Sequence, residues 1–269
     1  QGQVRHGLYP VASAALGRTM AVALIMGAML KGKEQLMIQI LSQGPLKGLV
    51  VRTNAAGQVR GYVRNPKIHL PLNAKGKLDV GQAVGSGTLH VIRDYNLKEP
   101  YQGSVPLQTG EIGDDFAYYF LRSEQTPSVV SVGTLVNPDG SVRRAGGCII
   151  QVMPGADKEL LDILEERTPR LPAVTTWFDS GKTPEELLYL YLGDLDLKIH
   201  GVQPVAFHCP CSLERFKQGL LTLGREELQQ MATEEEVVEM ICHFCQERYY
   251  LQRQEIMELI AELDEAKPS

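Results

Sequence analysis

Residues 11–30 read VASAALGRTMAVALIMGAML, and this stretch decides how the rest of the chain has to fold. It is apolar nearly all round, but Ser13, Gly17, Arg18 and Thr19 interrupt it, and a charge at mid-span is costly in lipid. A helix that is apolar on most sides has to be covered on most sides. We therefore expect a helix buried between other layers of a soluble core, with a membrane span as the minor alternative.

The chain that follows is β-rich up to about residue 150. Turn signals such as Asn54–Gly57 and Asn137–Gly140 separate short runs that carry Val, Ile and alternation. One helix is expected at Asp114–Ser123, because Phe116 and Phe120 share a face. Sheets around a buried helix make an α+β fold. The predicted strands are Leu36–Leu41, Gly48–Thr53, Val59–Val63, Gly87–Arg93, Val129–Leu135 and Cys148–Val152.

Short helices follow Pro154. Asp157–Glu166 has a leucine stripe, and the prolines of 168–172 end it. Thr183-Pro184-Glu185-Glu186 fits a capping box that opens a helix running to about Leu192. This stretch has no large core of its own, so we expect a connecting layer laid on the β-rich part.

Composition limits the function classes. The 269 residues are 43% hydrophobic and carry a formal net charge of −5, which excludes wholesale disorder and disfavours a nucleic-acid partner. Of five cysteines, four lie in the last 61 residues, which favours a metal or redox site in a reducing compartment over a secreted disulfide scaffold. The first ten residues show no signal peptide, and because the chain does not begin with Met, we also consider it as a fragment.

The cysteines form the sharpest motif. Cys209 and Cys211 make a C-x-C pair, and after 30 intervening residues Cys242 and Cys245 make a C-x-x-C pair. Two close pairs separated by a few dozen residues are what a tetrahedral thiolate site requires, and four thiolates favour Zn²⁺. We therefore predict one zinc ion per chain.

Two interpretations of this motif stay open. A structural zinc site is one, and four unligated cysteines are a weaker one. A C-x-C turn, however, crowds its thiolates, and zinc holds thiolates ready for oxidants. Oxidation of each pair would expel the metal and unfold a small domain, so the motif can also serve as a redox switch.

The remaining candidates are assigned lesser roles. His208 and His243 flank the pairs, but four sulfurs already fill a tetrahedron. Cys148 lies in an apolar run and is expected to be a buried, inert thiol. The tail is predicted to be a compact unit of helices and one hairpin: Ser212–Leu221, Arg225–Ala232, Val237–Ile241 with Arg248–Gln252, and Gln254–Leu263.

At this point the sequence resembles the heat shock protein 33 family of redox-regulated molecular chaperones. The tail motif, Phe207–Cys211 with Cys242–Cys245, is similar to the family's cysteine signature, including its spacing. The resemblance covers essentially the whole chain. One departure is that the family's N-terminal strand region before Tyr9-Pro10 is short or absent here. Family-like strings elsewhere are Tyr9-Pro10, Ala12–Arg18, Tyr101–Gly103, Ser123–Gln125, Gly146-Gly147 and Gln151–Gly155.

The resemblance implies a β/α/β chaperone core (residues 1–154), a helical linker (155–204) and a zinc-binding redox-switch domain (205–269). It implies an ATP-independent holdase of the bacterial cytoplasm, inactive while Zn²⁺ is held by Cys209, Cys211, Cys242 and Cys245. Oxidative stress with mild heat would form Cys209–Cys211 and Cys242–Cys245 disulfides, release zinc, unfold the switch and linker, and expose apolar surface to unfolding client proteins. The active form would be a homodimer.

Other classes are weighed against this one. A zinc-ribbon module that binds nucleic acid or protein is the first, but residues 209–269 hold 6 Lys and Arg against 13 Asp and Glu, a net of −7 that disfavours nucleic acid. A thiol–disulfide oxidoreductase would need its C-x-x-C in a βαβ context. Neither a P-loop, a dinucleotide loop nor a Ser/His/Asp arrangement is visible, so we expect no enzyme. Arg143-Arg144 is read as a solvated loop.

Overall fold

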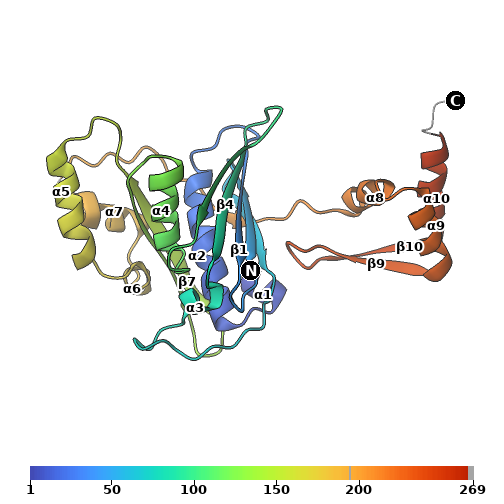
Figure 1. Cartoon of the computed structure of the whole chain (residues 1–269), viewed down its shortest axis with the longest axis horizontal. Helices are drawn as coiled ribbons and strands as arrows, with labels where there is room; N and C mark the ends of the chain where they lie inside the picture. The colour runs from blue at the N-terminus through green and yellow to red at the C-terminus, as the bar shows by residue number, and fades with distance from the viewer. Residues whose placement is uncertain (194, 266–269) are drawn as a thin grey trace. The chain divides into compact units, whose positions relative to one another are not determined.

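The structure is a computed structural model, and it describes residues 1–193 and 195–265 (Figure 1). It divides into two compact units. The first, Gln1–His208, is called the core unit below, and the second, which begins at Cys209, is called the tail unit.

The apolar stretch of the sequence forms helix α2, Pro10–Gly27, in the middle of the core unit. Pro10 stands at its first turn, where a missing N–H costs nothing. The helix is long and apolar enough to cross a membrane by length and composition, but 61% of it is buried inside the fold. Arg18, the charge that interrupts it, is paired with Glu111. The prediction of a helix buried in a protein core is confirmed.

A six-stranded sheet covers one side of α2 (Figure 1). All neighbouring strands of this sheet pair antiparallel except the last two, in which the two residues of β8, separated from the C-x-C motif by His208, run parallel to β3. Four strands fall within one residue of the predicted runs, whereas β5 and β8 were not predicted. The order is β5 (Tyr101–Pro106), β4 (Gly87–Asp94), β1 (Gln35–Ser42), β2 (Leu49–Asn54), β3 (Gln58–Val63) and β8 (Ala206–Phe207).

The other side of α2 is covered by the hairpin of β6 (Ser128–Val136) and β7 (Val142–Gln151). The chain therefore has the β/α/β layers that were expected of an α+β fold. One expectation was wrong: β7 begins six residues before Cys148, so Arg143-Arg144 lies on a strand and not in a loop. Helix α4 (Gly113–Ser123) buries Phe116, Tyr119 and Phe120 as predicted, and α1 (Gly2–His6) and α3 (Val80–Val84) are short.

The segment after Pro154 forms α5 (Lys158–Arg167), a 3-10 turn (Thr168–Arg170), α6 (Val174–Asp179) and α7 (Pro184–Leu192). These are called the linker helices. The capping box is present, since Thr183 accepts a hydrogen bond from the Glu186 amide and the Glu186 carboxylate accepts one from the Thr183 amide. Alternation along β6 and β7 gives the hairpin two buried faces, one toward α2 and one toward α6 and α7. The second face is buried in a cluster of Cys148, Val174, Leu187 and Tyr191.

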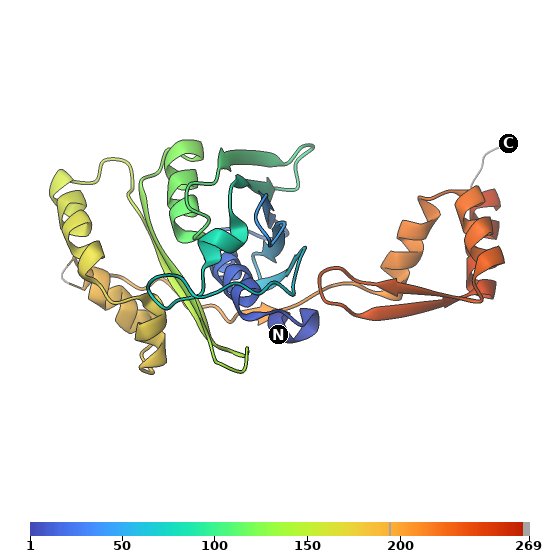
Figure 2. The ribbon, with the colours of Figure 1, turned by 60° about the horizontal axis from the view of Figure 1, so that its bottom comes forward.

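Up to residue 265 the tail unit consists of three helices and one hairpin, and the boundaries of its predicted elements are confirmed to within two residues. Figures 1 and 2 show the β9–β10 hairpin together with α8, α9 and α10. Its buried apolar cluster is small: Leu228, Met240, Leu251, Ile256 and Leu259. The elements are α8 (Leu213–Leu221), α9 (Arg225–Glu234), β9 (Val237–Ile241), β10 (Arg248–Gln252) and α10 (Arg253–Glu265).

Candidate metal centre

Two tight turns of the tail unit present the four cysteines. The C-x-C pair directly precedes α8, where Ser212 caps the helix by accepting a hydrogen bond from the Arg215 amide. The C-x-x-C pair closes the hairpin between β9 and β10. In that turn the Cys242 amide donates to the Glu247 carbonyl at 2.9 Å, and the Gln246 amide donates to the Cys242 carbonyl at 2.8 Å. Gln246 adopts a positive φ of 60°, which is what turns the chain back.

The turns bring the four sulfur atoms together. All of them lie within 4.8 Å of one another. Cys209 Sγ is 3.7 Å from Cys242 Sγ, and Cys211 Sγ is 3.3 Å from Cys245 Sγ. Cys242 and Cys245 are buried, Cys209 and Cys211 are half-buried, and none of the four is joined in a disulfide. Residues predicted from two separate motifs thus share one site.

This donor set fits a metal ion. Zinc holds sulfur at about 2.3 Å, so the sulfurs of a tetrahedral site lie about 3.8 Å apart, close to the separations found here. Four sulfurs and no carboxylate favour a soft ion. The flanking histidines stay outside the group, since both His208 and His243 have exposed side chains. The four cysteines could therefore hold one metal ion without further ligands.

The thiols differ in their surroundings. Burial raises the pKa of Cys245 well above that of an ordinary thiol. Burial also acts to raise the pKa of Cys211, but hydrogen bonds from the Tyr249 hydroxyl and the neighbouring thiols outweigh it and lower that pKa. The Tyr249 hydroxyl lies 3.3 Å from Cys211 Sγ and 3.1 Å from the Cys211 carbonyl oxygen. The two half-sites are therefore chemically unequal before any metal is considered.

Comparison with known proteins places this four-cysteine fold in a family. A family profile described as "Hsp33 protein" matches residues 1–252. The chain belongs to the Hsp33 family. The 33 kDa chaperonin of Bacillus subtilis is 49% identical over 257 residues, covering 95% of this chain and 88% of the relative. That of Desulforamulus reducens is 46% identical over 265 residues, covering 98% and 90%.

A solved Hsp33 structure has the same fold. The crystal structure of the 33 kDa chaperonin from Thermotoga maritima superimposes with a TM-score of 0.89 at 37% sequence identity. The match covers 98% of this chain and 90% of that one. The shared fold extends over both the core unit and the tail unit, so the resemblance seen in the sequence motifs is confirmed at the level of the family.

Sequence reasoning missed one residue of the site, Tyr249. The signal was available only in part, because β10 was predicted and Tyr249 lies four residues after Cys245. Strand alternation predicts on which face of β10 Tyr249 lies. It does not predict the contact between Tyr249 and Cys211, which depends on how the C-x-C turn and the C-x-x-C turn meet.

Cys148, the fifth cysteine of this Hsp33-family chain, lies in the core unit as a buried thiol. It is 6% exposed. Burial raises its pKa to about 11, and a hydrogen bond with Tyr191 of α7 opposes that shift. Because Tyr191 and Leu187 cover it, the exposure of Cys148 reports whether α7 is in place.

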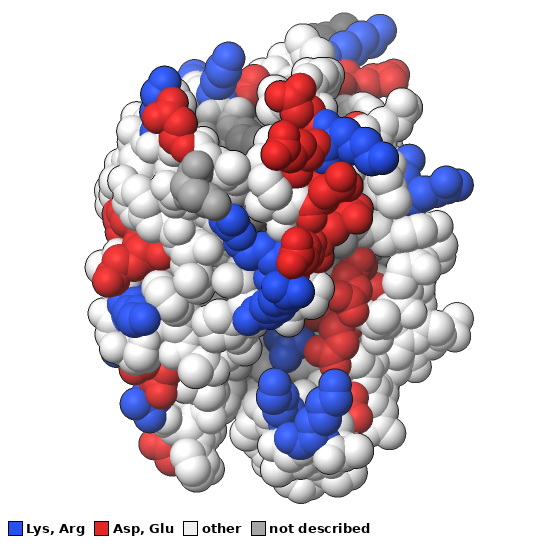
Figure 3. All heavy atoms as spheres, turned by 90° about the vertical axis from the view of Figure 1, so that its left-hand side faces the viewer, with Lys and Arg blue, Asp and Glu red and all other residues white. Residues whose placement is uncertain are grey.

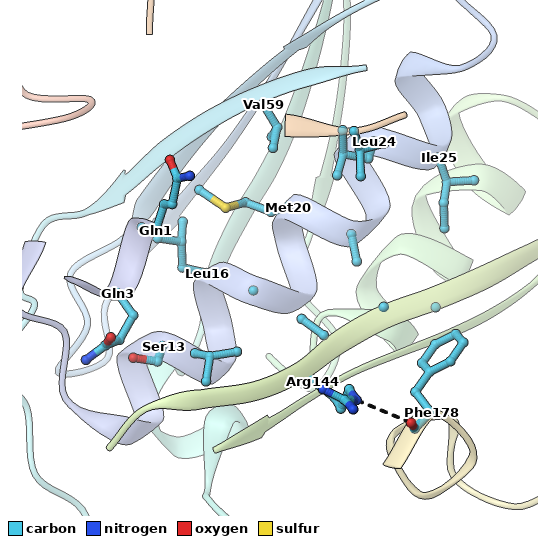
Figure 4. Close-up of a pocket in the computed structure, with 18 of the residues that line it drawn as sticks. Gln1, Gln3, Ser13, Leu16, Met20, Leu24, Ile25, Val59, Arg144 and Phe178 are labelled. Atoms are coloured by element: carbon cyan, nitrogen blue, oxygen red, sulfur yellow. Dashed lines mark hydrogen bonds between the residues drawn. The ribbon is translucent and has the colours of Figure 1, made fainter. Parts of the chain in front are cut away.

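The core unit also contains a cavity of about 770 Å³ along α2 (Figure 4). Leu16, Met20 and Leu24 line it from α2. Opposite them the Arg144 guanidinium donates a hydrogen bond to the Phe178 carbonyl at 3.4 Å, which ties β7 to the end of α6. The lining is mainly apolar and contains no cysteine. The cavity is therefore separate from the thiol chemistry.

The charge on the linker side of the core unit is mixed. Figure 3 looks onto the left-hand side of Figure 1, where α5, α6 and α7 lie, and shows acidic and basic side chains close together between wide uncharged areas. In the same unit, Arg143 on β7 forms an ion pair with Asp179 on α6 at 2.7 Å. This face does not present one continuous basic surface of the kind that attracts the phosphate backbone of a nucleic acid.

Proposed function

We propose that this protein is a redox-regulated, ATP-independent holdase chaperone. In the reduced state Cys209, Cys211, Cys242 and Cys245 hold one Zn²⁺, and the chaperone is inactive. Oxidation opens the site, unfolds the tail unit and the linker helices, and exposes apolar surface that holds unfolding clients. Membership of the Hsp33 family and the name chaperonin carried by its relatives support the chaperone part.

The observation that carries the proposal is the meeting of four thiols in a unit whose buried apolar cluster is small and is otherwise surrounded by partly buried side chains. The buried cluster of the tail unit is small, with Leu228 and Leu251 at its centre. Binding of a structural zinc supplies roughly 10 kcal/mol or more of apparent free energy. That equals the whole stability of many small domains, about 5–15 kcal/mol. Loss of the thiolates would therefore unfold this unit.

The oxidation step is balanced by peroxide. Two thiolates of one motif give up two electrons and one S–S bond forms, while one peroxide takes these two electrons with two protons from the solvent and becomes two waters. We propose the pairs Cys209–Cys211 and Cys242–Cys245, so two peroxides and four solvent protons consume four thiolates. When bound, Zn²⁺ supplies charge that keeps the thiolates deprotonated and close together. Each disulfide removes two ligands, and the ion is lost.

The linker helices are the second element of the proposal. Strand β8 is the last strand of the sheet of the core unit and pairs with β3, and Cys209 follows it after one residue. We propose that unfolding from Cys209 onward loosens this connection and then α7 and α6. Departure of the linker helices uncovers the outer face of β6–β7 and their own apolar side chains, which become available to clients. We place the protein in the bacterial cytoplasm and propose a homodimer as the active form, without nucleic-acid, membrane or enzymatic function.

One observation favours a second candidate, a constitutive structural zinc module that mediates protein binding. Sulfur contacts at 3.7 and 3.3 Å join the C-x-C motif to the C-x-x-C motif. Such cross-bracing is what a purely structural site uses to join two turns.

The test is zinc release and thiol counting during peroxide treatment, run beside an aggregation assay on a denatured test protein. The switch predicts one zinc per reduced chain, loss of four thiols together with that zinc, and suppression of aggregation that rises in step. Peptide mapping then assigns the disulfides. Zinc that stays bound, or leaves without any gain in suppression, would support the structural module instead.

A further inference from the structure

A tyrosine of the tail unit reaches into the four-cysteine cluster. Tyr249 lies on β10, and its hydroxyl is 3.3 Å from Cys211 Sγ and 3.1 Å from the Cys211 carbonyl oxygen. A hydroxyl has one proton, which it shares between these two acceptors. The residue therefore links the strand that follows the C-x-x-C turn to the sulfur of the C-x-C turn.

Packing holds this tyrosine in place. Its ring lies against Phe216 of α8, with ring centroids 5.1 Å apart and the planes tilted by 42°. Phe216 comes five residues after Cys211, so the helix that starts at the C-x-C turn also fixes the partner of that turn. On β9, Met240 is the residue directly opposite Tyr249. The position of the hydroxyl is thus set by the fold of the tail unit.

The hydrogen bond matters because a thiolate that binds a metal still accepts hydrogen bonds. Partners of this kind orient metal ligands and tune their binding, and their loss commonly costs 10–100-fold in metal affinity. The backbone amide of Glu247 serves Cys245 in this way. Cys211 instead uses a side chain, which a single substitution can remove without changing the backbone.

We propose that Tyr249 is a positioning residue of the metal centre: its hydroxyl fixes Cys211 opposite Cys245, strengthens metal binding and slows oxidative opening. This inference rests on the proposed function, because it assigns Tyr249 a part in regulating that same site. The tyrosine then sets how much oxidant the protein tolerates before its tail unit unfolds.

The test compares Tyr249→Phe with Tyr250→Phe in the full chain. Tyr250 is its neighbour on β10, but its hydroxyl donates to Glu239 at 3.1 Å and its side chain is 54% exposed. Zinc affinity is measured by competition with a chromogenic chelator, and zinc release by the same dye under peroxide. We expect Tyr249→Phe to lower affinity about 10–100-fold and to release zinc faster, whereas Tyr250→Phe matches the wild type.

Further outcomes keep the inference separate from the proposed function. Phe keeps the contact with Phe216, and hydrogen exchange of zinc-saturated Tyr249→Phe should show the wild-type pattern in α8 and α10. Wild-type affinity and release rate in Tyr249→Phe would overturn the inference and leave the zinc switch intact. Reduced wild-type protein without zinc would overturn the proposed function itself. Equal losses in both tyrosine variants would show a general weakening of β10 and would also overturn the role of Tyr249.

Discussion

The core unit and the tail unit are stabilised in different ways. In the core unit, α2 is buried between a six-stranded sheet and the β6–β7 hairpin, and residues from Leu8 to Phe120 join one apolar cluster. In the tail unit the buried cluster is small, and four thiols from two turns do the joining. The two parts of this chain are therefore held by different interactions: under the proposed function oxidants leave the core unit folded, whereas the fold of the tail unit depends on the oxidation state of its sulfurs.

The largest expected effect is removal of two thiols. Replacing Cys242 and Cys245 together by Ser should abolish zinc binding and unfold the tail unit, since about 10 kcal/mol of apparent metal-binding energy is lost. Hydrogen exchange should show full exposure of β9, β10 and α10, with β1 and β4 unchanged. The matched control is Cys148→Ala, which should retain one zinc. Protection of β10 in the double variant would show that the apolar cluster is sufficient.

The second prediction concerns a substitution that destabilises the core unit alone. Phe116 is fully buried and contacts Tyr119 and Phe120. Phe116→Ala should lower the free energy of unfolding of the core unit by about 3–5 kcal/mol, because it leaves a cavity. A urea titration followed by hydrogen exchange in β1 and in β10 measures the two units separately. Zinc affinity should stay at the wild-type value. A fall in zinc affinity together with the loss of core stability would contradict the separate stabilisation of the two units.

A smaller effect is expected where the linker helices meet the core. Gly146 on β7 and Gly133 on β6 stand directly opposite each other. A Cβ at Gly146 would lie 2.6 Å from Phe178 Cε2, so Gly146→Ala should weaken the seating of α6 by about 1–3 kcal/mol. The control is Gly201→Ala, where a Cβ meets nothing within 4 Å.

Alkylation of Cys148 measures this effect. With the linker in place the pKa of Cys148 is about 11, so little thiolate exists at pH 8. Once α7 lifts, the pKa should fall toward the ordinary value of about 8.5 and the reactive fraction should rise. Gly146→Ala should therefore speed the labelling of Cys148 at pH 8. The difference in labelling rate between this variant and the wild type should shrink as the pH nears 11. Equal rates in the Gly146 and Gly201 variants would show that α6 is not seated on this glycine.

The smallest effect concerns the cap of α7. Thr183→Ala removes the side-chain acceptor of the Glu186 amide and should cost about 1 kcal/mol of helix stability. Labelling of Cys148 should speed up slightly, because Tyr191 on α7 covers it. Thr183→Ser keeps the cap and should label at the wild-type rate. A Ser variant that labels like the Ala variant would mean that the methyl group, and not the cap, holds α7.

Local patterns predicted most of the elements of both units. The α2 helix, four of the sheet strands, α4 and the capping box at Thr183 follow from periodicity and turn chemistry, which act over a few residues. Strand β8 could not be predicted, because two residues become a strand only by pairing with β3. Helix α6 is short, and its position depends on tertiary packing against β6 and β7. The same long-range packing is why the sequence did not predict that Arg143-Arg144 lies on a strand.

The candidate site shows the same limit. The spacing of the cysteines predicted which residues meet, because each pair comes from one turn. It did not predict Tyr249, whose contact with Cys211 depends on β10 packing beside α8. Long-range neighbours of a motif are a property of the fold and not of the spacing.

Under the proposed function, oxidation unfolds the tail unit and frees the linker helices while the core unit stays folded. Hydrogen exchange on the full chain, reduced with zinc and then oxidised with peroxide, tests it directly. The account predicts that protection is lost in β9, β10, α8 and α10, that it falls in α6 and α7, and that it persists in α2, β1 and β4. Unchanged protection in the tail unit after all four thiols are oxidised would contradict the claim, and so would simultaneous loss in both units.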